Sequence, residues 1–301
     1  MSTASPATDA HAPARRRTLG AWFADTGWRH LVAIVVSVFA LFPLLYVVSA
    51  SLNPKGTLTG SNQLFSAIGI DSYVRILSDP QNPYGTWFLN TLLIAVVTGA
   101  VTVFIGACAA YAFSRMRFAG RRVGLVTIVV VQMFPQLLAV VAIFLLMSTL
   151  GDWFPAIGLN THTGLILVYL GGALGVNTYL MYGFFNTIPK EIDEAARIDG
   201  AGHARIFFTI ILRLVAPILA VVGLLSFIGT VNEYVIASVM LVDVDQQTLV
   251  VGLTKLVANP RYADWSAFSA GAVMAAIPVM ILFLFLQKYI VGGLTAGATK
   301  G

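Results

Sequence analysis

Six long apolar segments constrain this chain more than any other feature of its sequence. Five of them contain no charged residue, and the remaining one contains only Glu233. Roughly 20 apolar residues allow a helix to cross the hydrocarbon core of a bilayer. Only 10% of all residues are charged, compared with about 25% in soluble domains, so much of the surface must face lipid. The sequence therefore predicts an all-α integral membrane protein with six transmembrane helices, at residues 31–51, 87–113, 123–150, 163–188, 214–241 and 265–286.

The first apolar segment follows a tail, residues 1–28, that is rich in Ala, Pro, Ser and Thr and contains three consecutive arginines. We expect this tail to be disordered and residues 29–301 to form one membrane domain. A basic tail, an apolar run and the sequence Val48-Ser49-Ala50 also resemble a cleavable signal peptide. The apolar run is longer, however, than the usual signal-peptide core of about 7–15 residues. We therefore favour a first transmembrane helix.

Lysine and arginine are distributed unevenly between the two sides of the predicted membrane domain. If the tail is cytoplasmic, only Lys55, Arg75, Lys255 and Arg261 of the 18 basic residues lie on the outer side. Cytoplasmic segments of membrane proteins are enriched in Lys and Arg. The sequence thus predicts a multi-pass protein with both termini in the cytoplasm. The same placement explains the net charge of +5 as a result of membrane topology, so we expect membrane lipid and not nucleic acid as a partner.

The loop between the fourth and fifth apolar segments, residues 186–213, has the pattern of a short helix outside the membrane. Pro189 suits the first helical turn, because the N–H that proline lacks is not needed there. Asp193 and Arg197 have the i, i+4 spacing and order that favour an ion pair on a helix. Gly200 is placed to end the helix in a left-handed conformation.

This short helix carries a narrow apolar stripe, formed by Ile188, Ile192, Ala195 and Ala196. Small alanine side chains let another protein surface approach closely. The stripe therefore predicts a docking face. The alternative is a solvated helix that only connects two membrane spans.

The pattern Glu194-Ala195-Ala196, three residues, Gly200, nine residues and Ile210-x-Leu212 resembles the EAA signature of binding-protein-dependent ABC importer permeases. The resemblance implies the ABC importer permease fold, in which this coupling helix docks on a cytoplasmic ATPase and transmits its closure to the spans. By that resemblance, the residues that contact the ATPase are Glu191, Glu194, Ala195, Ala196, Asp199, Gly200 and Gly202.

One position departs from the family pattern. The signature ends in Leu-Pro, but Arg213 follows Leu212 here, and the next proline is Pro217. Because proline breaks or kinks a helix, its absence at position 213 predicts a straighter entry into the fifth span.

Three further segments resemble the sugar-permease branch of the family. The segments 87–91 (Trp-Phe-Leu-Asn-Thr) and 112–115 (Ala-Phe-Ser-Arg) look like that branch in general. The carboxyl end, residues 293–301, looks like the MalG-type maltose/maltodextrin permease subunits of the bacterial cytoplasmic (inner) membrane. In those subunits the tail reaches into the ATPase dimer. The resemblance therefore implies that the cytoplasmic tail, residues 291–301, offers a second ATPase contact through Thr295, Gly297 and Lys300.

Polar residues within the apolar segments are candidates for a sugar path. Four small or polar residues from Gly223 to Glu233 recur at intervals of three and four positions, which places them on one face of the fifth predicted helix. An ionised carboxylate at the bilayer centre costs about 2.5–3.5 kcal/mol on insertion scales, so Glu233 should face a partner, a cavity or water. Packing between helices through hydrogen bonds is the alternative role for such groups. The candidates for the path are Gln132, Asn177, Thr178, Ser226, Thr230 and Glu233.

The energy source is expected to lie on other chains. The sequence contains no G-x-x-x-x-G-K-[ST] phosphate-binding motif, so ATP and Mg²⁺ would bind a separate, dimeric ABC ATPase. The resemblance further implies a second homologous permease subunit and an extracytoplasmic sugar-binding protein, which would meet the outer segment 242–264. This chain is then a non-catalytic subunit without a cofactor or metal of its own.

Two other functions compete with the importer permease. An ion-coupled secondary transporter generally uses ionisable residues within its spans, and this chain offers only Glu233 there. A membrane-embedded enzyme is disfavoured, because the sequence has no paired acidic motif at a membrane face, no ordered Ser/His/Asp set and no HExxH. We therefore favour the importer permease and keep the ion-coupled transporter as the alternative.

Overall fold

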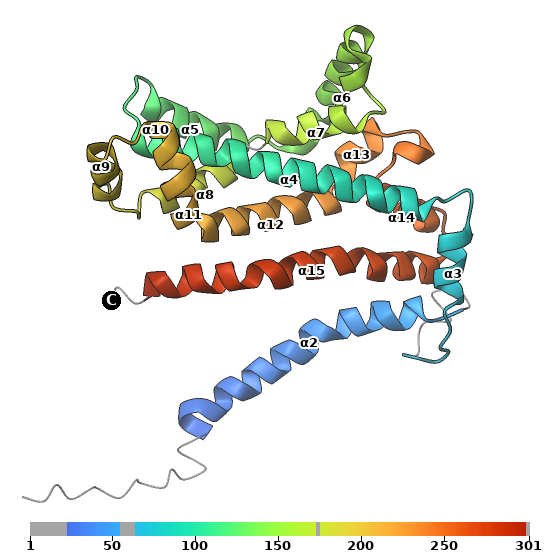
Figure 1. Cartoon of the computed structure of the whole chain (residues 1–301). Helices are drawn as coiled ribbons and strands as arrows, with labels where there is room; N and C mark the ends of the chain where they lie inside the picture. The colour runs from blue at the N-terminus through green and yellow to red at the C-terminus, as the bar shows by residue number, and fades with distance from the viewer. Residues whose placement is uncertain (1–22, 55–63, 173–174, 299–301) are drawn as a thin grey trace, which may run out of the picture. The chain divides into compact units, whose positions relative to one another are not determined.

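The computed structural model describes residues 23–54, 64–172 and 175–298, and every regular element within these ranges is helical (Figure 1). The chain divides into two compact units, residues 1–47 and 48–301. In the first unit the described residues form the π-helical turn η1 (Phe23–Gly27) and most of α2 (Trp28–Ser51). Most apolar side chains of this part of α2 are exposed, as expected of a helix that lies against lipid. The predicted disordered tail lies mainly outside the described residues.

The second unit contains one long central helix, one long carboxyl-terminal helix and a series of shorter ones. Its helices are α3 (Asp71–Ser78), α4 (Tyr84–Arg115), α5 (Arg121–Gln132), α6 (Gln136–Trp153), η3 (Pro155–Ile157), α7 (His162–Gly171), α8 (Val176–Phe185), α9 (Glu191–Ile198), α10 (His203–Arg205), η4 (Ile206–Ile211), α11 (Leu212–Leu214), α12 (Ala216–Asn232), α13 (Val235–Met240), η5 (Val244–Gln246), α14 (Leu249–Ala258) and α15 (Trp265–Ala298).

Among the described residues, three helices are long and apolar enough to cross a membrane alone, namely α2, α4 and the part of α15 up to Tyr289. Three bent pairs meet the same criterion together: α5 with α6, α7 with α8, and the segment His203–Leu214 with α12. The bends are 101°, 55° and 78°. The six predicted spans are matched if each pair crosses once, and three of those spans are then bent.

The breaks coincide with residues that cannot continue a helix well. Pro135 precedes α6 in an extended conformation, and proline supplies no backbone donor. The second break lies in a glycine-rich stretch, between Gly171 at the end of α7 and Gly175 before α8. Glycine is a poor helix former, because it loses the most backbone freedom when it folds.

The entry into the fifth span is bent rather than straight. The 78° bend falls at Val215, between α11 and α12, so the straighter helix predicted from Arg213 is wrong. Pro217 lies in the first turn of α12, a position that suits proline. The chain thus bends just before Pro217, and the missing proline at position 213 does not remove the break.

The central helix α4 organises the second unit. It runs beside α12 (Figure 1) and also packs against α7 and α8. At Gly99 the backbones of α4 and α12 approach so closely that an added Cβ would lie 3.7 Å from the Gly223 carbonyl oxygen. Near the carboxyl end of α4, the rings of Tyr111 and Phe207 pack with their centroids 5.0 Å apart. This aromatic contact belongs to a buried cluster that also includes Ala196 of α9.

Candidate functional site

The predicted coupling helix is α9, and its two ends are built by local interactions. It begins at Glu191, two residues after Pro189, so proline precedes the helix rather than occupying its first turn. Its first turn contains three acidic residues, which the positive end of the helix dipole stabilises. At the other end Gly200 has φ +79°, which confirms the predicted left-handed cap.

The end of α9 is a complete Schellman motif. The Gly200 N–H donates to the Arg197 carbonyl at 2.9 Å, and the Ala201 N–H donates to the Ala196 carbonyl at 2.9 Å. These two bonds satisfy carbonyls that a helix end leaves without partners. The motif fixes the direction in which the chain leaves α9.

Part of the α9 face that was predicted to dock on a partner is buried within this chain. Ala196 is buried and Ile192 is half-buried, and both pack on the chain's own core. The predicted apolar docking stripe is therefore mostly an internal surface, and the assignment of Ala196 to a partner contact is not supported, because its side chain is covered. The remaining predicted contact residues, Glu191, Glu194, Ala195, Asp199, Gly200 and Gly202, are exposed.

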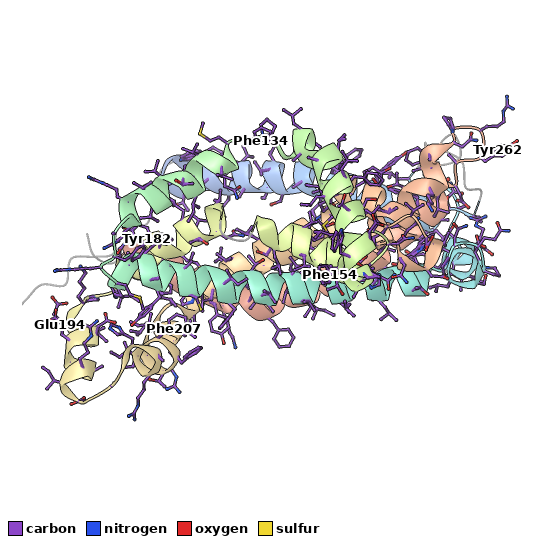
Figure 2. The ribbon with its side chains drawn as sticks, turned by 90° about the horizontal axis from the view of Figure 1, so that it is seen from above. Phe134, Phe154, Tyr182, Glu194, Phe207 and Tyr262 are labelled. Carbon is purple, nitrogen blue, oxygen red and sulfur yellow. The ribbon has the colours of Figure 1, made fainter. Side chains whose placement is uncertain are left out.

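Ile198 is the apolar residue of α9 that the sequence reasoning missed. Its side chain is 86% exposed and lies on a helix whose exposed surface is otherwise largely charged. Figure 2 shows Glu194 at the same end of the second unit as Phe207, with Tyr262 at the opposite end. In the sequence, Ile198 lies one position before Asp199 and outside the apolar stripe, so helical periodicity did not select it.

Asp193 does not form the predicted pair with Arg197. It is buried, and its Oδ2 lies 2.9 Å from Nε of Arg115 at the end of α4. The two side chains are 4% and 2% exposed, respectively. Arg115 also donates from Nη2 to the Ile188 carbonyl at 2.9 Å. A buried carboxylate needs a partner that compensates its lost hydration, and Arg115 meets that need better than an exposed residue on the same helix.

A second polar feature lies among α4, α7, α8 and α12. It is a pocket of about 310 Å³, which we call the polar pocket. Four of the six predicted path residues line it: Asn177, Ser226, Thr230 and Glu233. Asn177 Nδ2 donates to Ser226 Oγ at 3.3 Å, so the α8 and α12 groups already contact each other.

Glu233 lies beyond the end of α12 rather than on its face. Its carboxylate accepts hydrogen bonds from the Tyr169 hydroxyl at 2.6 Å and from the N–H groups of Ile236 and Ala237 at 2.8 and 3.0 Å. The last two bonds cap the first turn of α13, where orphan donors and the helix dipole favour an anion. The prediction that Gly223, Ser226, Thr230 and Glu233 share one helical face is therefore wrong at Glu233.

Two threonines of α4 complete the polar pocket and were missed by the sequence reasoning. Thr98 and Thr102 both line it and are each 3% exposed. Within the described part of the chain, the Thr98 hydroxyl has no hydrogen-bond partner. A buried polar group without a partner is costly, which makes this hydroxyl a ready contact for a ligand or water. The only sequence signal was a pair of threonines, four positions apart, in an apolar segment.

Other predicted residues lie elsewhere or cannot be placed. Thr178 is fully buried and does not line the polar pocket. Gln132 borders a separate, mainly apolar pocket and donates to the Gly172 carbonyl at 3.5 Å. The backbone at Thr295 and Gly297 belongs to α15, but the Thr295 side chain and Lys300 lie outside the described part of the chain, so the tail contact stays a prediction.

Near the start of α4, side-chain donors of that helix hydrogen-bond to residues 242–248. Trp87 Nε1 donates to the Val244 carbonyl at 2.8 Å, and Asn90 Nδ2 donates to the Asp245 and Gln247 carbonyls at 2.8 and 3.0 Å. These bonds hold the start of segment 242–264, which is predicted to meet the sugar-binding protein, against α4.

Comparison with known proteins identifies the family. Residues 102–295 match the family model described as "binding-protein-dependent transport system inner membrane component". The chain is 38% identical over 272 residues to the maltodextrin transport system permease protein MdxG of Bacillus subtilis, covering 90% of this chain and 95% of that protein. It is 39% identical over 273 residues to the galactooligosaccharides transport system permease protein GanQ of the same organism, with 90% and 94% covered.

Two further similarities extend to a MalG protein and to a solved structure. The chain is 38% identical over 282 residues to the maltose/maltodextrin transport system permease protein MalG of Escherichia coli, covering 90% of this chain and 95% of that protein. It is similar, with a TM-score of 0.72 and 29% identity, to a chain in the crystal structure of a bacterial ABC transporter involved in the import of the acidic polysaccharide alginate. That match covers 89% of this chain and 97% of the other. The chain therefore belongs to the family of inner membrane components of binding-protein-dependent transport systems.

Proposed function

We propose that this chain is the permease subunit of an ATP-driven importer for a sugar of the maltose or maltodextrin type. It forms half of the translocation path in the bacterial inner membrane, with both termini in the cytoplasm. The named relatives carry maltodextrin, galactooligosaccharides and maltose, which supports an oligosaccharide as the class of substrate. The uneven distribution of Lys and Arg supports the orientation.

The observation that carries the coupling role is the exposed face of α9. Ile198 is 86% exposed beside the exposed carboxylates of Glu191 and Glu194. An isolated exposed apolar residue with charged neighbours suits the centre of a protein contact, which a polar rim surrounds. A separate, dimeric cytoplasmic ATPase is the partner that this face would meet. A second permease subunit and an extracytoplasmic sugar-binding protein complete the complex.

The polar pocket supports a sugar path rather than an ion path. Its hydroxyl and amide groups, such as those of Ser226 and Asn177, are suited to the hydroxyls of a sugar. Glu233, the acidic residue within the predicted spans, already accepts three hydrogen bonds. Two of these bonds cap the first turn of α13, so the Glu233 carboxylate already has a structural role. This arrangement disfavours the ion-coupled alternative.

The docking role is tested by charge reversal on α9. We expect Glu194→Lys to abolish co-purification of the ATPase with this chain, while the variant still inserts into the membrane. The matched control is Asp152→Lys, a charge reversal at an exposed residue near the end of α6. Normal ATPase association and ATP-driven sugar uptake in Glu194→Lys would contradict the docking role.

A further inference from the structure

The end of α4 holds the coupling helix at several points. Besides the ion pair with Asp193 and the bond to the Ile188 carbonyl, the neighbouring Ser114 hydroxyl lies 2.9 Å from Oδ1 of Asn186 and donates to it. These contacts cover the loop before α9 and the first turn of α9 itself. The end of α4 and the start of the coupling segment therefore form one connected polar cluster, in which the Arg115 and Asp193 side chains are buried.

The same helix α4 also reaches the polar pocket. Thr98 and Thr102 line that pocket, and α4 is a single helix from Tyr84 to Arg115. At a rise of about 1.5 Å per residue, Thr102 lies about 20 Å along the helix from Arg115. An unbroken helix of this length transmits a displacement of one end to the other with little bending.

The covalent route from α9 to the pocket is less direct. It passes through α10, the π-helical turn η4 and α11, and then through the 78° bend at Val215 before it reaches α12. A π-helical turn and a sharp bend are points at which a helical path can deform. A displacement of α9 would be absorbed there more easily than along α4.

We propose that Arg115 is the positioning residue that joins the coupling helix to α4, so that movement of docked α9 passes through the Arg115–Asp193 pair and along α4 to the polar pocket. This role rests on the proposed function, because it requires an ATPase docked on α9. Arg115 touches neither sugar nor ATP. It keeps α9 and α4 in a fixed relation. The segment that connects α9 to α12 through Val215 adjusts to their movement.

The proposal is tested with the complete complex, purified through a tag on this chain and reconstituted with its binding protein and maltodextrin. The measured quantity is sugar transported per ATP hydrolysed, because a merely structural role would change the amount of assembled complex but not this ratio. We expect Asp193→Asn and Arg115→Gln to retain the ATPase yet to lower the ratio about tenfold, within the range typical of coupling between sites. The reversed pair Arg115→Asp/Asp193→Arg should restore much of the ratio.

An assembled Asp193→Asn or Arg115→Gln complex with an unchanged ratio would overturn the proposal. If the single variants do not assemble, the reversed pair decides. Assembly with restored coupling supports the proposal, whereas assembly without coupling, or no assembly, assigns the pair a structural role only and overturns it. Failure of the proposed function is distinct, since then no ATPase would co-purify with the unaltered chain.

Discussion

The coupling helix contains a buried acidic side chain and the polar pocket a half-buried one, and the two compensate their charge in different ways. Asp193 relies on one cation, Arg115, at 2.9 Å. Glu233 relies on three donors without formal charge, which are the Tyr169 hydroxyl and two backbone N–H groups. Compensation by a single partner is lost all at once when that partner is removed, whereas compensation by several donors weakens in steps. Under the proposed function, this difference would suit a rigid joint at the coupling end and a path that rearranges around sugar.

The largest effect is expected from removing the cation of the coupling end. Arg115→Met leaves the Asp193 carboxylate buried and unpaired, which should lower the free energy of unfolding by about 3–5 kcal/mol. Equilibrium unfolding of the purified chain in detergent measures this change. The double variant Arg115→Met/Asp193→Leu is the control and should recover most of the loss, because well-packed apolar residues often replace a buried ion pair without cost. A single variant as stable as the unaltered chain would contradict the account.

A smaller effect is expected when Glu233 loses one of its three donors. Tyr169→Phe removes the hydroxyl at 2.6 Å and should cost about 1.5–3 kcal/mol, as for other hydrogen bonds to charged groups. The control is Tyr179→Phe, at a tyrosine that is 51% exposed. If Tyr169→Phe destabilised the chain as much as Arg115→Met, the contrast between one partner and several would be wrong.

The backbone cap of α9 allows a further test at the coupling end. Gly200→Val places a β-branched residue at φ +79° and should destabilise the loop by about 1–2 kcal/mol. Gly202→Val is the matched control, because Gly202 has φ −72° and open space around its Cα. Hydrogen exchange of the loop amides measures the effect locally. Equal protection in the two variants would argue against a cap that depends on glycine.

The smallest effect on stability is expected at Thr98. Thr98→Val keeps the shape of the side chain and removes a hydroxyl that has no partner among the described residues, so the free energy of unfolding should stay nearly unchanged. If that hydroxyl binds sugar, the loss of about 1 kcal/mol raises the half-saturating sugar concentration about fivefold. Thr149→Val, at an exposed position outside the polar pocket, is the control. Unchanged uptake kinetics would remove Thr98 from the path.

Features that depend on neighbouring residues were predictable from the sequence. The apolar segments follow from composition over some twenty positions, and the short helix and its cap at Gly200 follow from turn and capping preferences. The pattern around Glu194 also indicated the family, which the match to residues 102–295 confirms. Each of these signals lies within a short stretch of chain, so no knowledge of the tertiary structure was needed.

Features that depend on distant residues were not predictable. Nothing near Asp193 indicates Arg115, and Arg197 offered a plausible local partner at i, i+4. The break at Glu233 has no proline to mark it, because the carboxylate creates it by capping α13. Asn177 and Ser226 were selected as separate candidates, and only the packing of α8 against α12 brings them into contact. Ile192 and Ala196 of the predicted docking stripe pack on the internal core, because a stripe of apolar residues fits a core as well as a partner.

The most direct test of the central claim is uptake of maltodextrin by the reconstituted complex in proteoliposomes, with the energy source varied. The account predicts uptake that requires ATP, the ATPase and the binding protein, and that persists when ionophores dissipate the proton and sodium gradients. Uptake by this chain without the ATPase, driven by an ion gradient alone, would contradict it.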